Sequence, residues 1–294
     1  MNKTETAPTD SNFSSPFISY KYCDNKKIVQ SADVVYLEAY TSVLEGAIID
    51  PARLQKAYKL NEPIQVAYRH TVEDEADDLL VEAARKKSIV LLVVGDPVCA
   101  TTHTDLLLRC REKKVPFQTI HNASIMGVAG ACGLQLYNFG QTISIPFFEG
   151  TNPPTSFYPK IQYNRRGSMH TLCLLDIKVR EPDYDAIMKG RTMRSVDGKE
   201  ELPYLPPRFM TVSQAAQQLI ETEVDLCREG AYDIHETLCV GLVRMGQSTQ
   251  QIVAGTLVQL SNYDFGPPLH SLIITGGNLH DMEKEFLKEY LIKD

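Results

Sequence analysis

Ile89-Val90-Leu91-Leu92-Val93-Val94-Gly95-Asp96-Pro97 is a run of aliphatic residues that ends abruptly in a Gly-Asp-Pro turn. An unbroken aliphatic run of this length is typical of a strand buried on both faces, as strands are in parallel sheets. Ligands of open parallel sheets bind outside the carboxyl ends of the strands, so the turn marks where a pocket is expected. An ordinary strand-to-helix turn has the same residue types, and the stretch alone leaves both interpretations open.

Segments of strand and helix character alternate on both sides of this stretch. The expected strands are residues 34–37, 64–68 and 117–120, and the expected helices are residues 72–87, 104–114 and 126–136. Acidic residues crowd the start of the segment 72–87 and basic residues its end, which matches the helix dipole. The alternation predicts an N-terminal α/β domain with a parallel sheet at residues 17–150.

A second α/β domain is expected at residues 151–294, because the preceding stretch 146–159 is rich in proline and glycine, as linkers are. Its expected strands are 171–175, 237–242 and 271–274, and its expected helix is 212–223. Turn residues between these segments predict hairpin-like connections and therefore a mixed sheet. Residues 1–16 contain almost no apolar side chains and are expected to form a disordered tail.

The composition excludes several classes of protein. A chain of 294 residues with 43% hydrophobic residues is long enough for about two domains with substantial cores. Its net charge of -7 argues against a broad nucleic-acid footprint, although Lys160, Arg165 and Arg166 form either a local basic patch or a solvated loop. The longest apolar run is far shorter than the ~20 residues that span a bilayer, and no signal peptide opens the chain, so a soluble cytoplasmic protein without membrane contact is expected.

The seven cysteines are scattered and never form a Cys-x-x-Cys pair, which predicts reduced thiols rather than a disulfide framework or a metal site. Phosphate-binding, serine-hydrolase and zinc-protease motifs are also absent from the sequence. Polar residues gather instead at the ends of expected strands, at Glu38, Asp96, His121, Asn122 and His270. Taken singly, His121 or Asn122 could cap a turn and His270 could be a hydrogen-bonded core histidine.

Eight blocks of sequence, in order along the chain, resemble the diphthine synthase family of the tetrapyrrole-methylase-like superfamily. The blocks are Tyr36-Leu37-Glu38-Ala39-Tyr40-Thr41-Ser42, Val94-Gly95-Asp96-Pro97, Ala100-Thr101-Thr102-His103, His121-Asn122-Ala123-Ser124-Ile125-Met126, and residues 169–178, 214–219, 254–257 and 268–276. The resemblance covers residues 34–280, and its longer blocks are specific to this family rather than to the wider superfamily.

The resemblance implies a two-domain α/β fold, in which each domain is a sheet flanked by helices and S-adenosyl-L-methionine binds in a cleft between the domains. It implies a homodimer that repeatedly methylates the 3-amino-3-carboxypropyl-histidine of translation elongation factor 2, a step of diphthamide biosynthesis. Carried over by motif, the cofactor contacts would be Asp96, Cys99, Ser124, Ile125, Leu175, Met245 and His270, with no metal. Glycine is expected at the position of Cys99 in relatives, so that contact would use its backbone.

Methyl transfer from a sulfonium is an in-line displacement, so the protein must position the reactants, exclude water and leave the attacking amine unprotonated. No covalent nucleophile is required, which agrees with the absence of a catalytic triad motif. Glu38, at the end of its strand, is a candidate catalytic residue that attracts the cationic amine or accepts its proton. The alternative is that Glu38 caps local backbone or pairs with a lysine.

The N-terminal region departs from the family pattern. Members begin with an apolar strand and a Gly-x-Gly-x-Gly-Asp loop, whereas residues 13–24 contain no glycine. Loss of that strand would expose a sheet edge, and loss of the loop would remove backbone groups from the cofactor site. Two further hypotheses therefore stand beside the methyltransferase. One is a non-catalytic relative that binds elongation factor 2 without cofactor turnover, and the weaker one is a methylase of a small tetrapyrrole.

Overall fold

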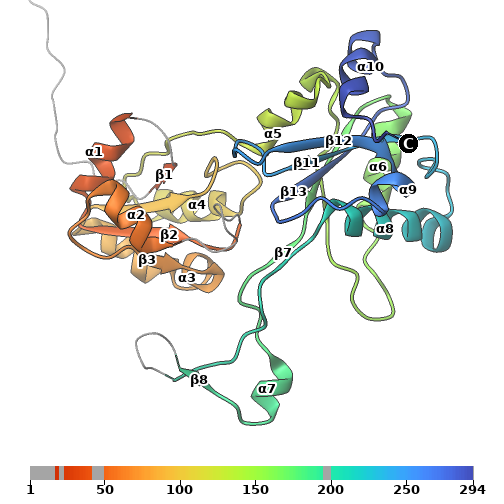
Figure 1. Cartoon of the computed structure of the whole chain (residues 1–294). Coiled ribbons are helices and arrows are strands. Elements are labelled where there is room, and N and C mark those ends of the chain that lie inside the picture. Colours follow the sequence, from red (N-terminus) through yellow and green to blue (C-terminus); the bar gives the residue numbers. More distant parts are fainter. Residues whose placement is uncertain (1–16, 20–22, 42–49, 195–199, 294) are drawn as a thin grey trace, which may run out of the picture. The chain divides into compact units, whose positions relative to one another are not determined.

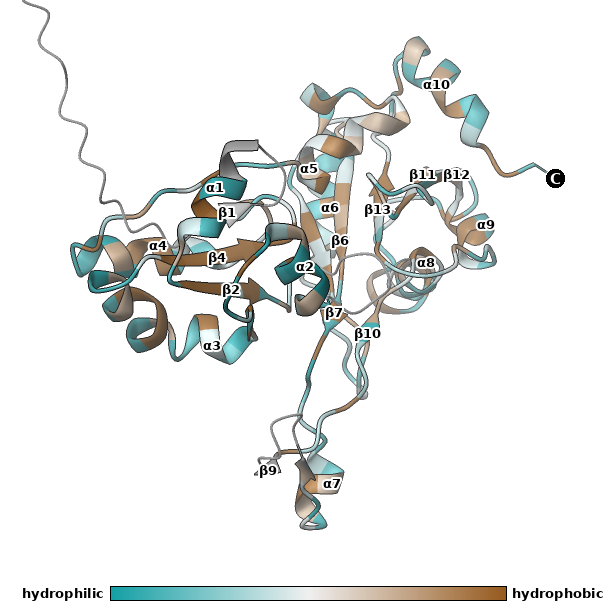
Figure 2. Cartoon of the chain, turned by 60° about the vertical axis from the view of Figure 1, so that its left-hand side comes forward, coloured by the Kyte–Doolittle hydropathy of each residue, from teal (hydrophilic) through white to brown (hydrophobic). Residues whose placement is uncertain are grey.

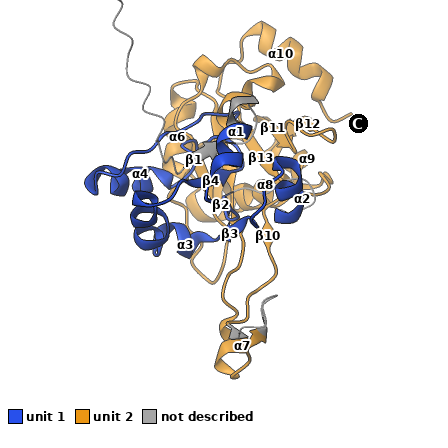
Figure 3. Ribbon diagram, turned by 90° about the vertical axis from the view of Figure 1, so that its left-hand side faces the viewer, with its two compact units in different colours: residues 1–124 blue, residues 125–294 orange. Residues whose placement is uncertain are grey.

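A computed structural model describes residues 17–19, 23–41, 50–194 and 200–293, so the expected disordered tail at 1–16 lies outside the described residues. The chain forms two compact units, Met1–Ser124 and Ile125–Asp294 (Figure 3). This division lies earlier than the boundary expected after residue 150. The physical reason is that strand β5 (Ile143–Ile145) pairs with β6 (Thr171–Leu175) and so belongs to the second sheet.

The sheet of the first unit is parallel, as predicted, with the strand order β1-β4-β2-β3. Its strands are β1 (Phe17–Ser19), β2 (Val34–Glu38), β3 (Gln65–Ala67) and β4 (Ile89–Val93). All five residues of β4 are buried, and the strand is uniformly hydrophobic in Figure 2. Alternate residues of β4 belong to the hydrophobic clusters on opposite faces of the sheet. The aliphatic run therefore does form the doubly covered central strand that the sequence predicts.

Strand β1 corrects the expectation that loss of the family's N-terminal strand exposes a sheet edge. Phe17 pairs with Leu91 and Ser19 pairs with Val93, so β1 covers the edge of β4 that would otherwise be open. Helix α1 (Cys23–Ser31) follows β1 after three residues that lie outside the described part of the chain. The glycine-rich loop is still missing from the sequence.

Helical segments accompany this sheet: α2 (Pro51–Tyr58), α3 (Arg69–Glu73), the π-helical turn η1 (Asp77–Glu82), the 3₁₀ turn η2 (Ala83–Arg85) and α4 (His103–Glu112). The expected single helix at 72–87 is thus a series of shorter pieces. The expected strand at 117–120 was wrong, because this segment is irregular. Strand β4 already has β1 on one side and β2 on the other, so the sheet offers no place beside it.

The sheet of the second unit is mixed, as predicted, with the order β12-β11-β13-β6-β5. Strands β11 (Leu238–Val243), β12 (Gln251–Thr256) and β13 (His270–Ile274) pair antiparallel, while β5 and β6 pair parallel. The helical segments are α5 (Ile125–Val128), η3 (Ala129–Cys132), η4 (Leu136–Asn138), α6 (Tyr158–Arg166), α8 (Val212–Glu221), η5 (Thr222–Cys227), α9 (Leu257–Ser261), α10 (Asp281–Leu287) and η6 (Lys288–Tyr290). The expected helix 126–136 is therefore interrupted.

An arm extends from this second sheet between residues 177 and 209 (Figure 1). Its base is the antiparallel pair β7 (Ile177–Lys178) and β10 (Arg208–Phe209). The far end carries α7 (Tyr184–Met188) and the pair β8 (Met193–Arg194) and β9 (Glu200–Glu201). The sequence does not predict the arm, because the strands that pair in it are too short to show a hydrophobic periodicity.

Within the described residues, no helix has the length and apolar character needed to cross a membrane. The cysteines with described side chains are all free thiols, namely Cys99, Cys110, Cys132, Cys173, Cys227 and Cys239. Four of them are buried, and burial raises the pKa of Cys110 to about 11 and that of Cys239 to about 12. Such buried thiols serve as small apolar side chains.

Candidate functional site

The Asp96 carboxylate joins two loops at the carboxyl end of β4. Its Oδ1 accepts the Val98 backbone N–H at 2.9 Å, and its Oδ2 accepts the Asn122 backbone N–H at 3.0 Å. His121 Nδ1 lies 3.0 Å from the same Oδ2. Burial alone would raise the pKa of Asp96, but these hydrogen bonds outweigh it and hold the pKa below its ordinary value. The carboxylate is therefore ionised and fixes the loop that follows β4 against residues 121–122.

Gly95 and Ser124 bring the same two loops together. Gly95 has a φ of +93°, and a Cβ built on it would lie 3.6 Å from the Ala123 carbonyl oxygen. The positive φ favours glycine at this turn. Burial raises the pKa of the Cys99 thiol, and a hydrogen bond with the Ser124 side chain opposes that rise. The structure thus brings together the three predicted contacts that lie in the first unit, which are Asp96, Cys99 and Ser124.

The predicted contacts of the second unit share one edge of its sheet. Leu175 ends β6, His270 begins β13, and Met245 follows the end of β11. The antiparallel register places Val243 opposite His270 and Leu174 opposite Ser271. Ile125 begins α5 and packs against the same hydrophobic cluster as Met245. Three of the predicted contacts therefore share this edge, and Ile125 joins Met245 against one hydrophobic cluster.

Both ring nitrogens of His270 have partners inside the protein. Nδ1 accepts the Val212 backbone N–H at 3.2 Å, and Nε2 donates to the Pro267 carbonyl oxygen at 2.9 Å. Burial lowers the pKa of His270, so its ring is neutral. These contacts agree with the alternative of a hydrogen-bonded core histidine, and they leave the backbone as its means of contacting a ligand.

Glu38 is completely buried at the end of β2. Its Oε1 accepts the backbone N–H groups of Tyr40 at 2.8 Å and Thr41 at 2.6 Å, and its Oε2 accepts the Thr41 hydroxyl at 2.8 Å. Burial raises the pKa of Glu38, and these hydrogen bonds oppose the rise. The arrangement supports the alternative that Glu38 caps the turn, while its catalytic role stays a prediction.

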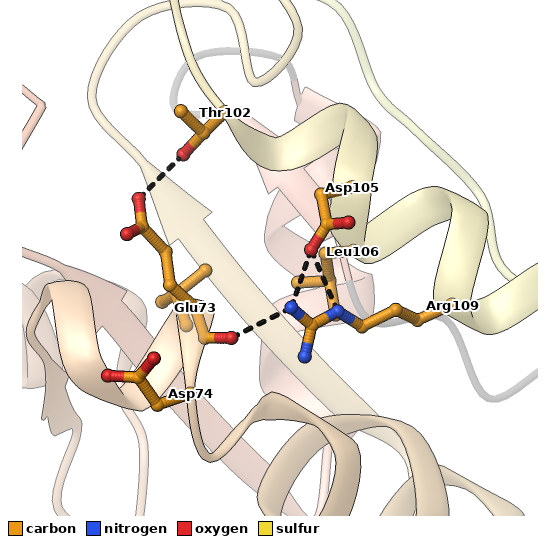
Figure 4. Close-up of a pocket in the computed structure, with 7 residues that line it drawn as sticks. Glu73, Asp74, Thr102, Asp105, Leu106 and Arg109 are labelled. Atoms are coloured by element: carbon orange, nitrogen blue, oxygen red, sulfur yellow. Dashed lines mark hydrogen bonds and ion pairs between the residues drawn. The ribbon is translucent and has the colours of Figure 1, made fainter.

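A surface pocket of about 380 Å³ lies in the first unit (Figure 4). It is lined by Val72, Glu73, Asp74, Thr102, Asp105, Leu106 and Arg109. The Glu73 carboxylate accepts the Thr102 hydroxyl at 3.1 Å and pairs with Arg69 at 3.1 Å, and the Arg69 guanidinium lies 5.0 Å from the centre of the Tyr40 ring. Sequence reasoning missed this pocket, because its residues come from two helices without a shared motif. The predicted cofactor contacts are not among its described lining residues.

Comparison with known proteins gives one consistent result. Residues 25–261 match the family model described as Tetrapyrrole (Corrin/Porphyrin) Methylases. A Homo sapiens protein named diphthine methyl ester synthase is 47% identical over 270 residues, which cover 91% of this chain and 89% of that protein. The protein of the same name from Dictyostelium discoideum is 46% identical over 265 residues, covering 90% and 91% of the two chains.

Comparison with solved structures gives the same family as comparison with sequences. A crystal structure of an Entamoeba histolytica protein assigned as a diphthine synthase has a TM-score of 0.77 and 37% identity, covering 95% of this chain and 98% of that one. A crystal structure of diphthine synthase has a TM-score of 0.72 and 27% identity, covering 94% and 95%. The likeness therefore extends over both units.

Proposed function

The chain belongs to the tetrapyrrole methylase family, among the diphthine methyl ester synthases, and from this membership we propose its reaction in detail. The chain uses S-adenosyl-L-methionine to methylate the 3-amino-3-carboxypropyl-histidine of translation elongation factor 2 repeatedly, forming diphthine methyl ester in diphthamide biosynthesis. The observation that carries the proposal is the likeness, along almost the whole chain, to proteins of that name. Cytoplasmic location and a homodimer, without nucleic-acid or membrane partners, belong to the same proposal.

The residues after β4 suit a cofactor that is rich in hydrogen-bonding groups. Gly95 has no side chain to block the approach of a ligand, and Asp96 holds the backbone of both neighbouring loops in fixed positions. We assign cofactor contacts to Asp96, Cys99, Ser124, Ile125, Leu175, Met245 and His270, with Cys99 and His270 contributing their backbones. S-adenosyl-L-methionine, when bound, supplies a methyl group activated by a positively charged sulfur.

The tasks left to the protein are positioning and control of protons. When the protein positions the amine and the methyl donor together, the reaction avoids the entropy cost of a bimolecular encounter. That cost is a large part of the activation barrier of the uncatalysed reaction. Loops tied together by a buried, ionised carboxylate provide the rigid support that such positioning needs. Such a site needs no covalent nucleophile, in agreement with the absence of a catalytic triad motif from the sequence.

The first experiment is isothermal titration of the whole chain with S-adenosyl-L-methionine. It is followed by methylation of elongation factor 2 that carries the unmethylated precursor, with added methyl groups counted by mass spectrometry. We expect binding and several methyl groups per factor. A matched protein carries the family's N-terminal strand and glycine-rich loop in place of the first 30 residues. Comparing the two proteins tests whether the missing loop affects cofactor binding.

The outcomes separate the hypotheses. Binding by the chain itself would show that the missing glycine loop is dispensable. Association with elongation factor 2 without methylation, combined with cofactor binding only by the matched protein, would favour the non-catalytic relative. Methylation of a free macrocycle but not of the factor would favour the tetrapyrrole methylase.

A further inference from the structure

We propose that His121 is a catalytic residue that accepts the proton released by the substrate amine. The inference deepens the proposed function and rests on it. It differs from the earlier candidate, because Glu38 is completely buried and engaged by neighbouring hydrogen-bond donors.

The geometry that carries the inference is a buried carboxylate that orients an exposed imidazole. His121 Nδ1 lies 3.0 Å from Asp96 Oδ2, and the side chains are 70% and 5% exposed, respectively. Two backbone N–H groups hold the carboxylate in place. Since an ionised carboxylate only accepts hydrogen bonds, a neutral His121 must carry its proton on Nδ1. Nε2 is then the basic nitrogen, and it has no hydrogen-bond partner among the described residues.

The other histidines have different surroundings in the described structure. His103, His170 and His270 are buried, with their rings hydrogen-bonded inside the protein. His280 Nδ1 accepts the Met282 backbone N–H as a helix cap, and His70 lies 3.9 Å from the exposed Glu75. His235 is exposed, and its side chain has no hydrogen-bond partner among the described residues. His121 alone combines a buried carboxylate partner with an exposed ring in the part of the chain described.

His121 also lies at the end of the sheet where a ligand is expected to bind. It shares Asp96 with the turn at the carboxyl end of β4, the sheet edge at which ligands of parallel sheets bind. Ser124, a proposed cofactor contact, follows three residues later in the same loop. A base oriented by a carboxylate beside the proposed methyl-donor site is the arrangement that general base catalysis requires.

The chemical step needs such a base. An aliphatic ammonium group holds its lone pair in an N–H bond at neutral pH. His121 Nε2 takes that proton, the freed nitrogen lone pair forms a bond to the methyl carbon, and the methyl–sulfur bond breaks with its electron pair remaining on sulfur. The imidazolium returns its proton to water before the next N-methylation. Methylation of the carboxylate oxygen releases no proton, so His121 is not required for ester formation.

The test replaces His121 by Gln, which keeps an amide that can donate to Asp96 but removes the basic nitrogen. The exposed His235 is replaced by Gln as the matched control. Each protein is measured for S-adenosyl-L-methionine affinity by isothermal titration. N-methylation is measured by mass spectrometry on unmethylated factor, and ester formation on factor whose amine is already trimethylated is measured as alkali-released methanol.

We expect His121→Gln to slow N-methylation about 100-fold, in the range of general base catalysis. We also expect cofactor affinity and the rate of ester formation to stay within about twofold of the unaltered protein, because neither needs the base. Added imidazole restores part of N-methylation. His235→Gln changes none of these quantities.

An unchanged rate of N-methylation in His121→Gln overturns the assignment and leaves the proposed function standing. Equal losses of both reactions without imidazole rescue overturn it as well, because they indicate a structural role. If the unaltered protein neither binds the cofactor nor methylates the factor, the proposed function fails and this inference fails with it.

Discussion

His170 Nε2 lies 3.1 Å from Glu283 Oε1, although 113 residues separate the two in the chain. Both side chains are buried almost completely. His170 Nδ1 accepts the Gly276 backbone N–H at 3.0 Å, so Nε2 carries the ring proton and donates it to the carboxylate. Glu283 also accepts the backbone N–H of Gln135 at 2.9 Å and that of His280 at 2.8 Å. One carboxylate therefore fastens helix α10 to the loop before η4 and to the start of β6.

This pair predicts that acid destabilises the second unit. Burial lowers the pKa of His170 below its ordinary 6.5. Below about pH 6.5 the unfolded chain therefore binds a proton at His170 more readily than the folded chain does, and the folded state loses stability as the pH falls. For Glu283, hydrogen bonds outweigh the effect of burial and lower its pKa below 4.5, so its contribution is present above that value and is lost as the pH falls further.

Urea denaturation at pH 7.5, 6.0 and 5.0 measures this effect, with the unfolding of the second unit followed by hydrogen exchange. We expect the free energy of unfolding to decrease with acid and His170→Gln to flatten the part of the decrease near pH 6. His235→Gln is the exposed control. An unchanged slope in His170→Gln would show that other groups bind the protons.

Gly276→Ala is predicted to destabilise the second unit, and Gly277→Ala is not. A Cβ at Gly276 would collide with the backbone carbonyl of Ser168, whereas a Cβ at Gly277 would have its nearest atom, Ser168 Oγ, at 3.8 Å. A clash with backbone cannot be relieved by a rotamer change, so we expect Gly276→Ala to cost about 2 kcal/mol or more in unfolding free energy. Thermal denaturation of the two variants checks the difference, and equal melting temperatures would refute it.

Gly95→Ala is predicted to impair cofactor binding through the backbone rather than by collision. The nearest atom to a Cβ at Gly95 lies at an ordinary contact distance, but its φ of +93° is unfavourable for alanine and costs about 1–2 kcal/mol. We expect weaker binding of S-adenosyl-L-methionine in isothermal titration. Gly127→Ala is the control, because a Cβ there meets no atom within 4 Å. Equal affinity in both variants would show that the turn tolerates a side chain.

Glu38→Gln is predicted to reduce stability more than catalysis. The amide offers one accepting oxygen where the carboxylate offers two, and three hydrogen-bond contacts depend on that carboxylate. We expect the unfolding free energy to fall by about 1–3 kcal/mol, with methylation per folded molecule nearly unchanged. Urea denaturation and methylation rates measure the two effects. A collapse of the rate without loss of stability would restore Glu38 as the catalytic residue.

The sequence predicted local elements where hydrophobic pattern and turn chemistry agree. Strand β4 is the clearest case, because its aliphatic run and Gly-Asp-Pro turn specify both its burial and its end. The segment 117–120 has apolar residues only at its two ends, Phe117 and Ile120, and it was predicted wrongly because strand pairing depends on which neighbours are already present. Local pattern does not contain that information.

The candidate site also depends on contacts that the local sequence pattern does not reveal. The sequence placed Asp96 and His121 at expected strand ends, but it could not show that their side chains meet across 25 residues. Likewise, it could not show that both nitrogens of His270 are already used, since those partners come from helix α8 and from the preceding loop. Residue type and position suggest candidates, whereas tertiary contacts decide which atoms remain available for chemistry.

Strand β1 has a consequence for how the protein avoids self-association. It occupies the edge of β4 through three backbone pairs, from Phe17 with Leu91 to Ser19 with Val93. A protein trimmed to begin after Ser19 would leave the peptide groups of this apolar strand open to strands of other molecules. Self-association by strand addition is then the expected failure of such a truncation, and it would precede any loss of the helices that cover the sheet.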